Sequence, residues 1–151
     1  MTRAIADALL SDLGQRIGLP GLQMDNHGCC RLAFDGRWLV TLALMPRGRL
    51  FLYCPVGSPD ATGALEAATL LCMLEGSFMG RGAAGATLAV GPDRRACVQR
   101  DLSLALLDAS SLHAEIEQIL STAETWSGRL ASPARGRAVA VKTATRIKAM
   151  A

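Results

Sequence analysis

The segment GRGAAG at residues 80–85 matches the G-x-G-x-x-G spacing that holds the pyrophosphate of a dinucleotide. That spacing has this meaning only when a strand runs into the first glycine and a helix starts at the last, because the helix N-terminus then faces the phosphate. Here a helix-like apolar stretch precedes the segment, and the strand-like run ATLAV follows it. Since this order is reversed, we predict a glycine-rich turn between a helix and a strand, and no nucleotide cofactor.

His27, Cys29 and Cys30 form a second group of residue types that could do chemistry. Neighbouring residues of a strand point to opposite faces, and no second pair of ligands follows at the spacing of a zinc site. A cysteine nucleophile with a histidine base would also need an orienting acid or amide that the sequence does not place. We therefore expect no metal site and no catalytic residue in this group.

The length and composition bound the class of protein. A chain of 151 residues, half of them apolar, is long enough for one globular domain with a substantial core. No apolar run reaches the ~20 residues that span a bilayer, so we predict no membrane insertion. The cysteines are five in number, lie mostly in apolar segments and form no C-x-x-C, which indicates a reducing cytoplasm.

The net charge of +3 conceals two regions of opposite sign. Residues 1–128 carry 10 basic and 13 acidic residues, whereas residues 129–151 carry six basic residues and no acid. We therefore predict a folded domain over residues 1–130 and a flexible basic tail over residues 131–151. The mildly acidic body argues against nucleic-acid binding by the whole domain. The tail leaves one alternative open, a small nucleic-acid-binding regulator that neutralises phosphates with it.

The hydrophobic pattern predicts an α+β fold with the element order α-β-β-β-α-β-β-α. Helical spacing covers residues 3–17, 60–76 and 112–130. The runs CCRLAF, WLVTLALM and LFLYCPV are separated by the breaks DGR and PRGR, which predicts an antiparallel meander. ATLAV and ACVQRDL predict a second hairpin. The elements together suggest a twisted antiparallel sheet packed with helices.

The helix expected over residues 60–76 has two apolar faces. Leu65, Ala68 and Cys72 form one face, and a second face lies nearly opposite, formed by Ala67, Leu70, Leu71 and Leu74. Such a helix needs two partners: the sheet and either a second copy of the chain or the last helix of the same chain. Excess apolar surface indicates a protein interaction site, and an open sheet edge can accept an added strand. These features predict a dimeric module that binds a peptide or protein.

The stretch IGLPGLQMDNHGCCRLAFDGRW at residues 17–38 resembles the class I chaperones of bacterial type III secretion, the Tir-chaperone-like family. The resemblance continues through LFLYCPVG, LLCMLEGSFMGRGAAGATLAV and VQRDLSLALLDASSLHAEIEQILSTAETW, over roughly residues 3–130. This sequence differs from the family pattern in two places. The asparagine common after the second helix is replaced near Glu75–Ser77, and the basic tail has no counterpart in the compact, acidic members.

The resemblance implies a cytoplasmic homodimer with no enzymatic activity and no cofactor. Such a chaperone binds the N-terminal, non-globular segment of one or more secreted effectors, keeping them soluble and competent for export through the secretion ATPase. By the same resemblance, the residues in or near the effector-binding grooves are Leu9, Leu13, Leu32, Phe34 and Leu42. The residues implied at the dimer interface are Leu70, Leu74, Leu88 and Val90.

Overall fold

The computed structural model describes residues 1–57 and 65–131. The helices are α1 (Thr2–Ile17), α2 (Ala67–Ser77) and α3 (Ala109–Ala131), with short 3-10 turns at η1 (Pro46–Gly48), η2 (Phe78–Gly80) and η3 (Leu104–Leu106). The strands are β1 (Cys29–Phe34), β2 (Trp38–Met45), β3 (Arg49–Pro55), β4 (Thr87–Val90) and β5 (Ala96–Ser103). This succession confirms the predicted α+β class and element order.

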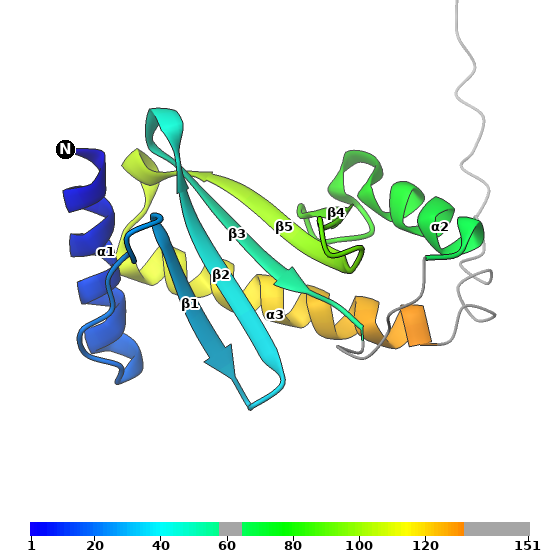
Figure 1. Cartoon of the computed structure of the whole chain (residues 1–151), viewed down its shortest axis with the longest axis horizontal. Helices are drawn as coiled ribbons and strands as arrows, with labels where there is room; N and C mark the ends of the chain where they lie inside the picture. Colours follow the sequence, from blue (N-terminus) through cyan, green and yellow to red (C-terminus); the bar gives the residue numbers. More distant parts are fainter. Residues whose placement is uncertain (58–64, 132–151) are drawn as a thin grey trace, which may run out of the picture.

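The five strands form one antiparallel sheet in the order β1-β2-β3-β5-β4. The meander and the second hairpin are both present, and β5 joins them by pairing with β3 on one side and β4 on the other. β1 and β4 are the edge strands. Figure 1 shows α1 and α2 at opposite ends of the molecule, with α3 running along the sheet between them.

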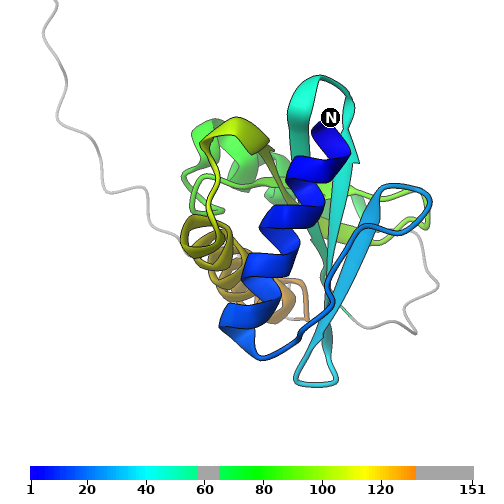
Figure 2. The ribbon, with the colours of Figure 1, turned by 90° about the vertical axis from the view of Figure 1, so that its left-hand side faces the viewer.

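Helices α1 and α3 cover the same face of the sheet, and the core lies between them and the strands (Figure 2). Alternate residues of each strand point into this core, as the period of a β-strand requires. The strands contribute to this core the side chains of Cys30, Leu32, Val40, Leu42, Leu50, Leu52, Cys54, Leu88, Ala96 and Val98. The predicted apolar stripe of α3 supplies Leu112, Ile116, Ile119, Ala123 and Trp126 to the same core.

Helix α2 begins later than its apolar spacing suggests. Glu66 has an extended backbone, with φ −66 and ψ 150, and the helix begins at Ala67. The first residues of the expected helix, 60–64, lie outside the described part of the chain. The helix therefore consists of the eleven residues that carry its leucines.

Trp126 of α3 holds α2 and the glycine-rich turn together. Its indole Nε1–H donates to the carbonyl of Gly82 at 3.0 Å, and its ring lies against Gly76 of α2 so closely that a Cβ there would overlap it. Gly82 in turn lies against the backbone of Gly76. GRGAAG thus leads from α2 and η2 into β4 as predicted, and its glycines permit close packing of the backbone.

Candidate functional site

The second apolar face of α2 lies on the surface of the chain. Its residues recur at helical spacing and continue into η2, so they form one stripe. We call this surface the α2 patch; its members are Leu70, Leu71, Leu74, Phe78 and Met79, and all are exposed. Neither the sheet nor α3 covers them, so of the two alternatives expected for this face, a second copy of the chain remains and the last helix does not.

The residues expected at a dimer interface divide into two groups. Leu70 and Leu74 of the α2 patch are 37% and 69% exposed, and Val90 on the edge strand β4 is 45% exposed. Leu88 is only 6% exposed, because it packs inside the chain beneath α2, where Ser77 Oγ accepts from its N–H at 2.9 Å. Leu88 therefore connects α2 to β4 within one chain, while the other three side chains are available to a partner.

The five residues expected in or near effector-binding grooves lie mostly in the core. Leu13 and Leu42 are fully buried, and Leu9 and Leu32 are also buried, between α1, α3 and the sheet. These four side chains build the fold and lie beneath the surface that a bound segment could reach. Phe34, at the end of β1, is half-buried and is the member of the set that borders the surface.

The edge strand β1 presents free backbone groups along one side. Just before β1, Gly28 C=O accepts a hydrogen bond from Leu44 N–H of β2 at 2.8 Å. This bond shows which residue pairs of the β1–β2 ladder are hydrogen-bonded to each other and which are not. In an antiparallel ladder, alternate residues then direct their N–H and C=O groups away from the partner strand. On β1 these outward residues are Cys29, Arg31 and Ala33.

Asp25 closes one end of this edge. Its carboxylate accepts from the N–H groups of Cys29 at 2.9 Å and His27 at 2.8 Å, and its own N–H donates to Cys29 C=O at 2.7 Å. The hydrogen bonds from Cys29 and His27 hold the pKa of Asp25 below its usual value. Arg31 and Ala33 are left with N–H and C=O groups that an added strand could pair with.

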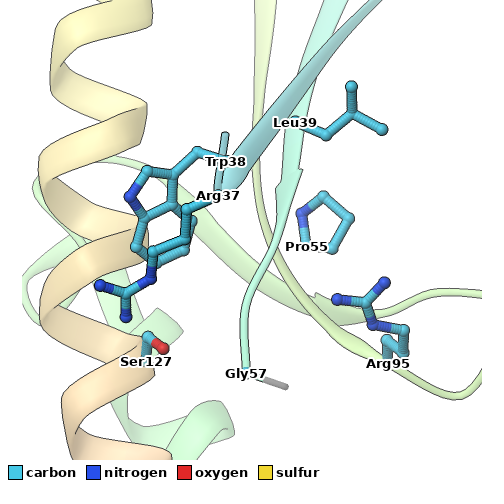
Figure 3. Close-up of a pocket in the computed structure, with 7 residues that line it drawn as sticks. All are labelled: Arg37, Trp38, Leu39, Pro55, Gly57, Arg95 and Ser127. Atoms are coloured by element: carbon cyan, nitrogen blue, oxygen red, sulfur yellow. The ribbon is translucent and has the colours of Figure 1, made fainter. Parts of the chain in front are cut away.

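A cavity of about 490 Å³ opens where the β1–β2 turn, the end of β3 and α3 meet (Figure 3). We call it the arginine pocket; it is lined by Arg37, Trp38, Leu39, Pro55, Gly57, Arg95 and Ser127. Sequence reasoning missed it because its residues come from segments that are distant along the chain. The DGR and PDRR turns carried its arginines, but no local pattern shows that they share a cavity.

Three of the five cysteines are buried. Burial raises the pKa of Cys54 to about 11 and also raises the pKa values of Cys30 and Cys97. Their thiols therefore stay protonated near neutral pH, and a protonated thiol is a poor nucleophile and metal ligand. Among the described residues, no three His, Cys, Asp or Glu side chains come together as a metal site. None of the described helices has the length and apolar character needed to cross a membrane.

The sequence matches the Tir chaperone protein (CesT) family over residues 8–127, which is most of the chain. The chain belongs to this family. The match confirms the resemblance stated from residues 17–38 and from the order of the elements. No curated protein matches the sequence.

Several solved structures share the fold of this family member. A chain of the ExsC–ExsE complex superimposes with a TM-score of 0.72 at 26% identity, covering 85% of this chain and 95% of that one. A chain of the HopA1–SchA chaperone–effector complex gives 0.71 at 21% identity, covering 85% and 97%. The Yersinia pestis type III secretion chaperone SycH, in complex with a stable fragment of YscM2, gives 0.63 at 17% identity, covering 80% and 98%.

Proposed function

We propose that this protein is a type III secretion chaperone that binds the N-terminal, non-globular segment of one or more secreted effectors. The observation that carries the proposal is the family match over residues 8–127. The fold shared with a chain of the HopA1–SchA chaperone–effector complex supports it. The protein acts in the cytoplasm as a homodimer, without catalysis or a cofactor, and delivers its client to the secretion ATPase. The rival nucleic-acid regulator depends on the basic residues beyond 131, which lie outside the described part of the chain.

The open edge of β1 offers a way of binding such a segment. A non-globular chain has unpaired N–H and C=O groups, and an exposed strand edge can pair with them. Arg31 and Ala33 carry the free groups of this edge, and Phe34 borders it. The client segment extends the sheet beside β1, while its side chains contact the surface nearby.

Proline at position 33 should weaken client binding while the fold is retained. Ala33→Pro removes one outward N–H, and proline is tolerated on edge strands because the lost donor does not face the neighbouring strand. The control is Ala33→Val, which keeps the N–H and suits a strand. We expect loss of client pull-down with Ala33→Pro alone, at similar thermal melting of both variants. Equal binding by the two variants would remove this edge from the proposal.

The client itself can be identified by co-purification. The full-length protein, expressed with a tag in a cell that carries a type III secretion apparatus, should retain one or a few secreted proteins in stoichiometric amount. Removal of the client's N-terminal segment should abolish retention, because the rest of the effector folds independently of the chaperone. Retention that depends on DNA and disappears after nuclease treatment would favour the nucleic-acid regulator instead.

A further inference from the structure

The arginine pocket carries positive charge that no described carboxylate neutralises. The guanidinium groups of Arg37 and Arg95 take part in none of the ion pairs among residues 1–57 and 65–131. The Nε atom of Arg95 is buried and meets no acceptor there. Asp93, the nearest acid along the chain, accepts instead from the backbone N–H of Arg95 at 3.1 Å. The pocket therefore holds unused donors and favours an anionic acceptor.

The walls of the pocket combine apolar side chains with the two arginines, and part of this lining is fixed. Figure 3 shows Arg37 and Trp38 on the α3 side, Arg95 on the opposite side, and Pro55 and Gly57 between them. The Arg37 guanidinium lies over the Trp38 ring, 4.6 Å from its centroid, and this cation–π contact holds both side chains in place. A volume of about 490 Å³ exceeds the needs of one carboxylate and leaves room for an apolar neighbour.

The pocket and the open edge of β1 are one strand apart. Leu39, one of its wall residues, pairs directly with Ala33 across the β1–β2 ladder. A segment that adds to β1 at Ala33 is therefore separated from this wall residue by β1 alone. The basic stretch over residues 132–151 contains no acid, so its charge has the same sign as the pocket and it is not the complementary occupant.

We propose that the arginine pocket binds an acidic side chain of the client segment, a glutamate or aspartate beside an apolar residue. The inference rests on the proposed chaperone function, which it makes more specific. Arg95 binds the carboxylate, Arg37 adds positive potential, and Trp38 and Pro55 contact the apolar neighbour. The pocket thus selects one position of the client sequence by its negative charge. The apolar surfaces of the chain make no such selection.

Nuclear magnetic resonance with two short peptides tests this proposal on the full-length, ¹⁵N-labelled protein. The probes are N-acetyl-Leu-Glu-Leu-amide and N-acetyl-Leu-Gln-Leu-amide. We expect the glutamate peptide to shift the Trp38 indole and Arg95 Nε–H resonances saturably, and the glutamine peptide to bind about tenfold more weakly. Trp126, the other tryptophan of the chain, is an internal control because its indole is buried on Gly82. Equal affinities would overturn the proposal.

Variants of adjacent arginines locate the effect. Arg95→Gln should abolish the preference for glutamate, and Arg37→Gln should reduce it severalfold. Arg94→Gln changes the net charge equally at an exposed residue that does not line the pocket, so the preference should persist. Loss of the preference in Arg94→Gln would indicate a general charge effect and overturn the proposal. A change of oligomeric state in Arg95→Gln would assign the pocket to a second copy and overturn it as well.

The test of the pocket and the test of the proposed chaperone function can fail independently of each other. A protein that captures a secreted client but treats the two peptides alike would overturn the acidic subsite alone. A protein that prefers the glutamate peptide but retains no secreted client would overturn the chaperone function and support the pocket as an anion site.

Discussion

Replacement of Leu74 by glutamate is expected to convert a dimer into a monomer without unfolding the chain. Leu74 is 69% exposed in the single chain, so a carboxylate there remains hydrated and costs the folded monomer little. In a dimer built on the α2 patch, the same carboxylate would be desolvated without a partner, which costs several kcal/mol. A loss of about 3 kcal/mol weakens association more than a hundredfold.

Light scattering and circular dichroism together test this expectation. Leu74→Glu should give the mass of one chain and an unchanged helix signal. Leu106→Glu is the matched control, since Leu106 is 84% exposed in η3 and outside the α2 patch, and it should leave the dimer intact. A Leu74→Glu protein that remains a folded dimer would exclude this face from the interface.

Gly76→Ala is expected to destabilise the protein, although alanine is the better helix former. In an exposed helix interior this replacement raises stability by up to about 1 kcal/mol. At position 76 the new methyl group would overlap the Trp126 ring and lie 3.1 Å from Leu88 Cδ1. Trp126 cannot move away, because its indole is buried and bonded to Gly82. Overpacking of this kind costs about 1–3 kcal/mol, so the free energy of unfolding should fall.

The control is a glycine on α3 with free space around it. Gly128 has no atom within 4 Å of a built Cβ, so Gly128→Ala should raise the free energy of unfolding by up to about 1 kcal/mol. Urea denaturation measures both changes. An increase in stability with Gly76→Ala would mean that the packing of α2 on Trp126 is looser than the structure indicates.

The element order was predictable from the sequence because periodicity and turn residues are local signals. The DGR break between CCRLAF and WLVTLALM is present as the β1–β2 turn, and the apolar stripe from Leu112 to Trp126 faces the core. The start of α2 was not predictable in this way, since the apolar residues at 61, 64 and 65 also recur at helical spacing. The extended backbone of Glu66 there is a product of the fold.

Exposure at the site depended on contacts that a sequence does not display. Leu74 and Leu88 are both apolar residues near the same turn, yet one is on the surface and the other lies beneath α2. The difference in exposure follows from the packing of α2 on β4, and the spacing of apolar residues in the sequence does not predict that packing. Arg37 and Arg95 likewise line one cavity only because the fold brings the β1–β2 turn close to the β4–β5 turn.

The short open edge of β1 has a mechanical consequence. Asp25 occupies the backbone groups of Cys29, so a bound strand is held mainly at Arg31 and Ala33. Each backbone hydrogen bond contributes only about 1 kcal/mol net. A client pulled from one end, at right angles to the strand, would lose these bonds one after another instead of all at once. Force applied to the client's free end in this direction would therefore detach the client, while the chaperone remains folded and able to bind another client.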